Sequence, residues 1–148
     1  MTDLECLLER WKSEGIEVLP PLPRVQVRAS FERLGVSATN DVVALYEVCG
    51  GMTDMDADYW RLWSLREVEE ENSENLERGV LFGDYLINSW CYRLRKINDE
   101  TSAVYVDYFD GTEPEIAAPN LFEFLSCLLK QPRRVLERRA TRCPPKEA

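Results

Sequence analysis

Carboxylates are the first residues of this sequence whose type and position could support chemistry. Asp84, Asp107 and Asp110 lie in or beside apolar stretches, and glycoside hydrolysis requires two acids held at a fixed separation across a cleft. No nucleophile or metal motif accompanies these acids, and nothing selects one pair of them. The chain also has no histidine, the commonest general base and zinc ligand. We therefore expect no catalytic residue and no enzyme activity.

A second group of acids, Asp54, Asp56 and Asp58, has the spacing that opens a calcium-binding loop. Such a loop needs glycine at its sixth position and glutamate at its twelfth, where this chain has Tyr59 and Leu65. A glycine-rich phosphate-binding loop is also missing from the sequence. We expect no metal and no cofactor. An exposed acidic loop beside aromatic residues is instead typical of a protein contact, although the aromatic residues could equally anchor the loop.

A carboxylate, Asp84, also interrupts the most core-like stretch of the chain. If residues 87–89 form a tight turn between antiparallel strands, Asp84 shares a face with Trp90 and Tyr92 and points inward. A buried carboxylate needs donors, such as the Tyr92 hydroxyl, the Trp90 indole or backbone N–H groups. A bulge at Gly83 would instead turn the carboxylate outward. Both arrangements are compatible with the sequence.

The net charge of −9 is unevenly distributed. Residues 131–148 carry six basic and two acidic residues, a net of +4, so the other 130 residues carry −13. A body this acidic repels nucleic acid and attracts basic proteins, although solubility alone would also explain it. The glutamates after residue 66 form a run that is typical of a solvated helix face. Their functional interpretation is mimicry of a phosphate backbone, through Glu69, Glu70, Glu71 and Glu74.

Apolar periodicity, capping motifs and turn residues predict the elements that position these side chains. We predict helices at about 3–14, before Gly35, from Ser37 or Asn40 to Gly50, from Ser64 to about Asn72, from Asn120 to Pro132, and at roughly 133–140. We predict strands at 61–63, 80–87, 90–97, 103–109 and 115–117. This order predicts the α+β class, with a twisted, mostly antiparallel sheet flanked by N- and C-terminal helices.

Alternation with period two predicts which side chains share a face of this sheet. When apolar faces are matched, Arg93 lies among Tyr105 and Asp107, on the face away from Trp90 and Tyr92. The resulting patch is predicted to be solvated, so it is either a contact surface or an ordinary cross-strand ion pair worth at most about 1 kcal/mol.

The length of 148 residues fits one domain, 1–148, with a core at about 25–130 and a polar basic tail at 140–148. The five cysteines are scattered and never form a CxxC pair, which favours reduced thiols. No apolar run approaches the length that spans a bilayer, and the N-terminus lacks a signal-peptide pattern. We expect a cytoplasmic protein that does not contact a membrane.

Six motifs follow one another in a recognisable order: FERLG at 31–35, VALYEVCGG at 43–51, LWSL at 62–65, FGDYLI with WCY at 82–92, VYVD at 104–107 and LFEFL at 121–125. This order resembles the SUKH superfamily, which is named partly after a yeast regulator of cell-wall synthesis. The resemblance covers roughly residues 25–130. Its structural signature would be Gly50, Gly51, Trp63, Gly83, Asp84, Trp90 and Tyr92.

The resemblance implies a SUKH-like α+β fold and a protein-binding function. Many bacterial members resemble immunity proteins that neutralise toxins, often nucleases, whereas eukaryotic members are interaction modules. We expect a non-catalytic immunity protein that binds a basic toxin domain stoichiometrically, and no nucleic acid. The alternative is a regulatory or scaffolding protein without a toxin partner. The expected contacts are Asp54, Asp56, Asp58, Tyr59, Glu69, Glu70, Glu71, Glu74, Tyr85, Arg93, Tyr105 and Asp107.

Overall fold

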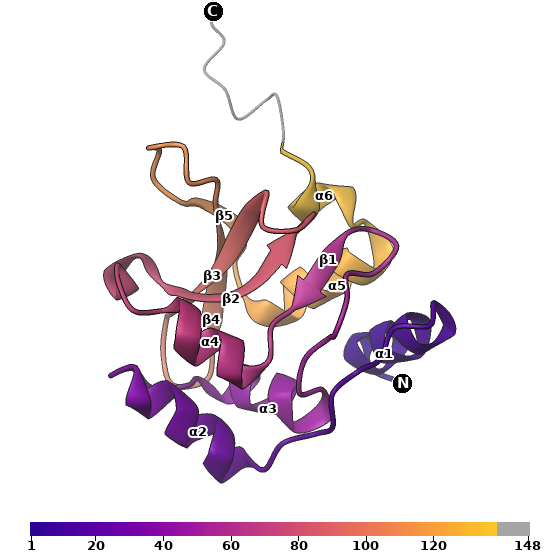
Figure 1. Ribbon diagram of the computed structural model, residues 1–148, viewed down its shortest axis with the longest axis horizontal. Helices are drawn as coiled ribbons and strands as arrows, with labels where there is room; N and C mark the ends of the chain where they lie inside the picture. The colour runs from indigo at the N-terminus through magenta and orange to yellow at the C-terminus, as the bar shows by residue number, and fades with distance from the viewer. Residues whose placement is uncertain (139–148) are drawn as a thin grey trace, which may run out of the picture.

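The computed structural model of the chain describes residues 1–138. Its helices are α1 (Asp3–Ser13), α2 (Arg24–Arg33), α3 (Asn40–Val48), α4 (Leu65–Glu71), the short 3₁₀ helix η1 (Leu76–Arg78), α5 (Leu121–Lys130) and α6 (Arg133–Leu136). Its strands are β1 (Trp60–Leu62), β2 (Val80–Tyr85), β3 (Trp90–Lys96), β4 (Ser102–Asp107) and β5 (Glu115–Ala118). All neighbouring strands are antiparallel, in the order β1-β2-β3-β4-β5 (Figure 1). The predicted α+β class is confirmed.

Several helices begin at the residues that the capping motifs predict. Thr2 forms a capping box with Glu5 at the start of α1, and Ser64 forms one with Glu67 at the start of α4. The Asn120 side chain accepts a hydrogen bond from a backbone N–H of the first turn of α5. These contacts are local, which is why the sequence alone predicts them.

The start of α3 differs from the prediction. Neither Ser37 nor Asn40 is the N-cap residue, which is Thr39, and its side chain makes no capping bond. The Thr39 hydroxyl instead lies 2.6 Å from the Ser102 hydroxyl and donates to the carboxylate of Asp41. Asp41 also accepts from the backbone N–H of Ser102 at 3.0 Å. These bonds join α3 to β4, a long-range contact that local sequence does not reveal.

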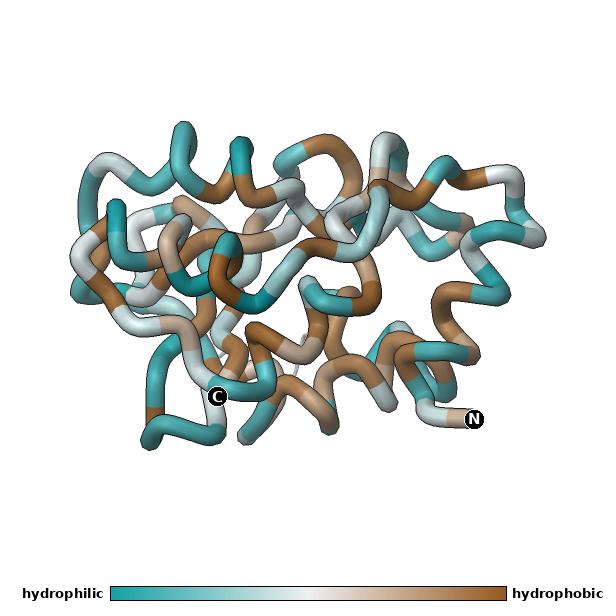
Figure 2. Tube along the Cα trace, turned by 90° about the horizontal axis from the view of Figure 1, so that it is seen from below, coloured by the Kyte–Doolittle hydropathy of each residue, from teal (hydrophilic) through white to brown (hydrophobic). Residues whose placement is uncertain are grey.

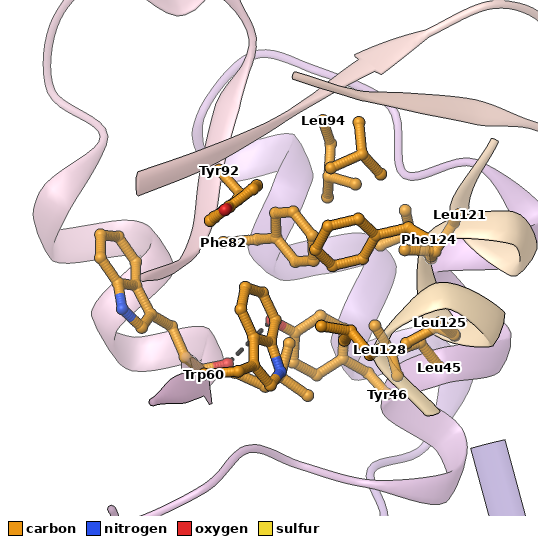
Figure 3. Packing of buried hydrophobic residues seen from close by; sticks show 14 of the residues in the cluster. Leu45, Tyr46, Trp60, Phe82, Tyr92, Leu94, Leu121, Phe124, Leu125 and Leu128 are labelled. Carbon is orange, nitrogen blue, oxygen red and sulfur yellow. Dashed lines mark hydrogen bonds between the residues drawn. The ribbon is translucent and has the colours of Figure 1, made fainter. Parts of the chain in front are cut away.

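An aromatic cluster fills the space between the sheet and helices α3 and α5 (Figure 3). The ring of Trp60 lies at its centre, with centroids 5.8 Å from Phe82, 5.5 Å from Tyr92 and 5.2 Å from Phe124. These tilted and edge-on contacts suit the charge distribution of aromatic rings. The hydroxyl of Tyr46 on α3 donates to a backbone carbonyl at 2.8 Å. Brown and teal stretches alternate within the helices in Figure 2, as burial of one helix face requires.

A β-bulge in β2 determines which side chains of this strand face the aromatic cluster. Leu81 pairs with Arg93, but Gly83 pairs with Tyr92, so Phe82 is an extra residue between two pairs. The side-chain alternation therefore changes phase at Phe82, which is fully buried in the core.

The bulge moves Asp84 to the sheet face that lies away from the aromatic cluster. Asp84 pairs with Cys91, and Tyr85 pairs with Trp90. The prediction that Asp84 shares the face of Trp90 and Tyr92 is wrong, and the bulge alternative is confirmed. Asp84 is nevertheless only 2% exposed, so the outer face of the sheet has a buried layer of its own.

The C-terminal helices close the core from the side opposite this outer face. The Tyr92 hydroxyl donates to the carbonyl of Val135 at 2.6 Å, which holds α6 against the sheet. The predicted last helix at roughly 133–140 is observed at Arg133–Leu136, and the predicted tail at 140–148 lies outside the described residues. Among residues 1–138, no helix has the length and apolar character needed to cross a membrane.

Candidate functional site

Four residues form a row across strands β1 to β4 on the outer face of the sheet. Arg61 pairs with Asp84, Asp84 with Cys91, and Cys91 with Asp107. We call these four residues the polar row. Its last three members are buried, and Arg61 is half-buried. Charged side chains are seldom buried without partners, so the contacts of this row determine what it can do.

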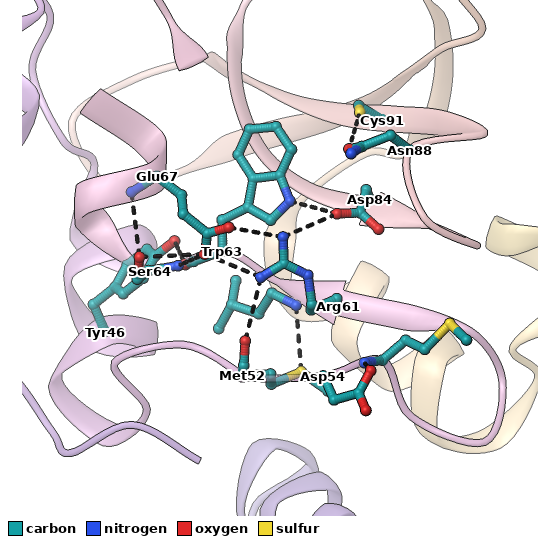
Figure 4. Close-up of polar contacts among 12 residues, drawn as sticks. Tyr46, Met52, Asp54, Arg61, Trp63, Ser64, Glu67, Asp84, Asn88 and Cys91 are labelled. Atoms are coloured by element: carbon teal, nitrogen blue, oxygen red, sulfur yellow. Dashed lines mark hydrogen bonds and ion pairs between the residues drawn. The ribbon is translucent and has the colours of Figure 1, made fainter. Parts of the chain in front are cut away.

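Asp84 is held by donors from β1 and the residue that follows it. Its Oδ2 accepts from the Trp63 indole Nε1 at 2.6 Å and from an Arg61 guanidinium nitrogen at 3.4 Å (Figure 4). The expected buried, hydrogen-bonded carboxylate is therefore present. Its donors differ from the predicted Tyr92 hydroxyl and Trp90 indole because the bulge turns Asp84 to the other face.

Glu67 connects helix α4 to the polar row. Its two carboxylate oxygens accept from Arg61 at 3.0 and 2.8 Å. Burial opposes the ionisation of Glu67, but hydrogen bonds from Arg61 and Ser64 lower its pKa overall. The same bonds to Glu67 raise the pKa of Arg61. One guanidinium thus lies between the carboxylates of Glu67 and Asp84, and this group of three carries one excess negative charge.

Arg93 and Asp107 form a buried ion pair at the far end of the polar row. Arg93 Nε lies 2.8 Å from Asp107 Oδ2, and the two side chains are 4% and 1% exposed. Arg93 also donates to the carbonyl of Gly79 at 2.8 Å, and its guanidinium carbon lies 6.0 Å from the ring of Phe109. The prediction that this pair lies on a solvated face is wrong, because Gly79 and Phe109 cover it. A rigid partner does not reach these two side chains.

The two tyrosines predicted to join this patch lie on opposite faces of the sheet. Tyr85 stacks on Trp90, with ring centroids 4.7 Å apart, on the face of the aromatic cluster. The guanidinium of Arg95 instead lies over the ring of Tyr105, with its carbon 3.9 Å from the ring centroid. Tyr105 pairs with Arg93 as predicted. The bulge in β2 is again the cause of the difference, because it exchanges the faces of Asp84 and Tyr85.

The acidic loop, residues 53–59, is anchored by one of its own acids. Asp56 is 4% exposed and accepts from the Trp11 indole at 2.8 Å and from two backbone N–H groups that follow it. Burial raises the pKa of Asp56, while these hydrogen bonds oppose the shift. Asp54 and Tyr59 are exposed. The loop therefore presents Asp54 and Tyr59 to solvent, whereas Asp56 is an internal anchor.

Glu69 of the acidic helix connects α4 to α2. Its carboxylate accepts from Arg33 at 2.7 Å and from the Ser30 hydroxyl at 2.6 Å. These bonds lower the pKa of Glu69 to about 2. Glu69 is thus engaged within the molecule.

The remaining acids that were predicted to contact a partner differ in whether they form ion pairs within the chain. Asp58 and Glu70 each pair with an arginine, at 3.6 and 3.1 Å. Glu71 and Glu74 are exposed and form no ion pair with any residue in the range 1–138. Of the acids on α4 and the loop after it, these two are the most available to a partner.

Two adjoining hollows open above the polar row. The first, the Glu hollow, has a volume of about 340 Å³ and is lined by Arg61, Trp63, Glu67, Glu71, Asn88 and Phe109, among others. The second, the Asp hollow, has a volume of about 180 Å³ and is lined by Asp54, Met55, Arg61, Asp84, Ile87 and Asn88, among others. Arg61 and Asn88 line both, so the two hollows adjoin each other.

Exposed apolar side chains lie at the hollows and beside them. Ile87 and Phe109, 76% and 55% exposed, line them. Leu86, 40% exposed, precedes Ile87 in the chain, and its backbone N–H donates to the carbonyl of Tyr59, 45% exposed, at 2.9 Å. We call these four residues the apolar rim. All four have positive φ angles between 48° and 69°, a backbone conformation that costs non-glycine residues about 1–3 kcal/mol each.

The hollows present carboxylates and one guanidinium, groups that can bind cations and hydrogen-bond donors. Burial raises the pKa of the Cys91 thiol to about 12, so at neutral pH it is no nucleophile. No group of three or more His, Cys, Asp or Glu within residues 1–138 is arranged to hold a metal ion. What remains is a set of carboxylates beside exposed apolar surface.

Sequence reasoning identified the acids but missed Arg61, Asn88, Ile87 and Phe109. The sequence could have indicated Arg61 as a site residue, because it is the polar residue of an apolar strand and follows a tryptophan. It could not have indicated Ile87 and Phe109, since no residue type predicts left-handed backbone at an isoleucine or a phenylalanine.

The glycines of the proposed signature lie where backbones approach closely. A Cβ at Gly50 would lie 2.3 Å from the carbonyl oxygen of Pro20, and one at Gly51 would lie 2.9 Å from the backbone nitrogen of Ser64.

No family model, no curated protein and no solved structure matches the chain. The resemblance to the SUKH superfamily therefore stays a prediction.

Proposed function

We infer that the chain is a non-catalytic protein-binding module, and that the apolar rim with the two hollows is its contact surface. The observation that carries this inference is a group of four exposed apolar side chains on strained backbone, of which Ile87 and Phe109 line carboxylate-lined hollows. Protein interfaces typically combine apolar or aromatic anchors with a polar surround. Strained backbone concentrates at functional surfaces, because selection for stability alone would remove it.

The charge of this surface indicates a basic partner. Asp54, Glu67, Glu71 and Asp84 line the hollows against one cation, Arg61. The first 130 residues carry −13, and a field of this sign accelerates encounter with positively charged proteins. The resemblance to the SUKH superfamily supports the specific form of the proposal. In that form the chain is an immunity protein and its partner is a basic toxin domain, such as a nuclease.

The same contacts support binding over catalysis. A general acid or base must exchange its proton with a substrate, but Glu67 shares the Arg61 guanidinium with Asp84. The Cys91 thiol stays protonated at neutral pH. We therefore propose that Asn substitution of Asp84 and Asp107 removes no turnover, and that the chain acts stoichiometrically.

Co-expression with any basic protein that is encoded beside this chain's gene tests the proposal. The expected result is a one-to-one complex that co-purifies, dissociates as salt rises, and protects cells from the toxicity of the partner. A complex with a non-toxic partner would support the scaffolding alternative over the immunity role. The absence of both a complex and protection would contradict the immunity proposal.

A further inference from the structure

The Asp84 carboxylate leaves one acceptor oxygen unused. Both of its bonds, from Trp63 and Arg61, reach Oδ2. Oδ1 accepts no hydrogen bond from any residue between 1 and 138, and Figure 4 shows it directed away from the Trp63 indole. The side chain is only 3% exposed, yet it lines the Asp hollow. Oδ1 is not one of the buried atoms that lack a partner; it lies at the hollow, where this acceptor is open to a donor from outside the chain.

The charges around Oδ1 favour a donor that is a cation. The nearest positive group, Arg61, is already bonded to both oxygens of Glu67 as well as to Asp84. Asp54 adds a further carboxylate to the wall of the hollow and forms no ion pair within the described part of the chain. A second cation would therefore meet uncompensated negative charge in partly dry surroundings, where charge-assisted hydrogen bonds are strongest.

The shape of the Asp hollow suits one long side chain. Its volume of about 180 Å³ is below the roughly 300 Å³ at which sites for free small molecules begin. Met55 and Ile87 supply apolar walls, against which an aliphatic stem can pack while its charged end reaches the carboxylate. Ile87 also belongs to the apolar rim, so a side chain entering here would come from a protein bound at that surface.

We propose that the Asp hollow receives one arginine side chain of the partner, with its guanidinium donating to Asp84 Oδ1. This proposal rests on the protein-binding function inferred above and specifies what that surface recognises. Arginine is favoured over lysine because its planar fork has several donors and can serve two acceptors, here Asp84 and Asp54, whereas an ammonium is more strongly hydrated.

The probe that tests this is a short peptide, acetyl-Gly-Arg-Gly-amide, titrated into the full ¹⁵N-labelled chain. The Trp63 indole N–H reports directly, because it donates to Asp84. The Trp11 indole N–H, which donates to Asp56, is the internal control. We expect a saturable shift of the Trp63 signal with a dissociation constant on the order of millimolar, and no shift of the Trp11 signal. The citrulline peptide, which is nearly isosteric and uncharged, should leave both signals in place.

Two variants and a control define the outcome. Asp84→Asn keeps an acceptor for Trp63 and should weaken peptide binding by about tenfold. Asp54→Asn is exposed, leaves the fold intact and should weaken it by about threefold. Glu74→Gln removes an exposed acid outside the hollow and should change nothing. Equal shifts with the citrulline peptide, equal binding of a lysine peptide, or unaltered binding by both aspartate variants would overturn the proposal.

Failure of this proposal is distinguishable from failure of the proposed function. If the arginine peptide does not bind but a protein partner still forms a complex that depends on the apolar rim, the proposal that the Asp hollow receives arginine is wrong and the proposed binding surface stands. If the peptide binds as expected, the shift maps to Asp84 whatever protein supplies the arginine.

Discussion

At the scale of single residues, the molecule shows how buried acids are kept in place. Asp84, Asp107, Asp56 and Asp41 are at most 4% exposed, and each accepts hydrogen bonds from named donors. The sequence predicted that Asp84 would need donors if it were buried. It could not identify them, because Arg61 lies beside Asp84 only through strand pairing.

Removal of the Asp84 carboxylate should destabilise the fold. Asp84→Ala leaves the Trp63 indole N–H buried without its 2.6 Å acceptor, and an unsatisfied buried donor costs about 1–3 kcal/mol. Urea unfolding measures the loss. Asp54→Ala, an exposed acid of the same hollow, should change stability by less than about 0.5 kcal/mol. Equal effects of the two substitutions would mean that Asp84 does not hold Trp63.

The buried pair of Arg93 and Asp107 predicts strong non-additivity. Arg93→Met leaves a charged Asp107 with 1% exposure, and breaking such a pair on one side costs about 3–5 kcal/mol. The double variant Arg93→Met with Asp107→Leu should be more stable than the single variant, since no uncompensated charge remains. A double-mutant cycle from denaturant unfolding checks this. A cost below about 1 kcal/mol for Arg93→Met would instead indicate a solvated pair.

At the scale of elements, helices and strands were predictable because their signals are local. Capping boxes at Thr2 and Ser64 and the cap at Asn120 lie within four residues of the groups that they bind. The sequence left open whether β2 has a bulge that turns Asp84 outward. It could not decide, because the bulge depends on a tertiary contact. Gly83 lies against the Trp60 ring, and a tryptophan in another strand is invisible to periodicity.

Gly83→Ala tests why the bulge has glycine. The added Cβ would lie 2.3 Å from Trp60 Cη2 and 2.9 Å from the carbonyl oxygen of Arg61, so the sheet or the core must shift. We expect a loss of about 3 kcal/mol in thermal or urea unfolding. Gly35→Ala is the control, because its Cβ meets nothing within 4 Å and only its φ of +83° opposes substitution. That control should lose about 1 kcal/mol. Similar losses at the two glycines would argue against a steric role for Gly83.

The contact between α2 and α4 should depend on pH through Glu69. Its pKa of about 2 in the folded protein is below its ordinary value of 4.5. Glu69 therefore adds stability that is complete above about pH 4.5 and is lost as pH falls toward 2. Because Arg33 is largely exposed, the contribution should not exceed about 1 kcal/mol. Unfolding of the native chain and of Glu69→Gln at several pH values checks this. Their stability difference should shrink on acidification, and a difference that grows would contradict the assignment.

At the scale of the whole molecule, the acidic charge was evident from composition, and the location of the proposed contact surface was not. Asp54 and Glu71, both predicted to contact a partner, line the hollows. Arg93 and Asp107 lie beneath Phe109 and the loop that contains Gly79. The apolar rim depends on left-handed backbone at Leu86 and Ile87 in the β2–β3 turn and at Tyr59 and Phe109, which a residue pattern without glycine does not predict.

The most direct test of the account is the affinity of a basic partner protein, found by the co-expression above, for two charge variants of this chain. Ile87→Asp alters the apolar rim, and Val25→Asp alters a side chain of nearly equal exposure, 77% against 76%, on α2. Both add the same charge. Isothermal titration calorimetry should show binding at least about tenfold weaker for Ile87→Asp and unchanged for Val25→Asp. Equal affinity of the two variants would contradict the central claim that this rim is the binding surface.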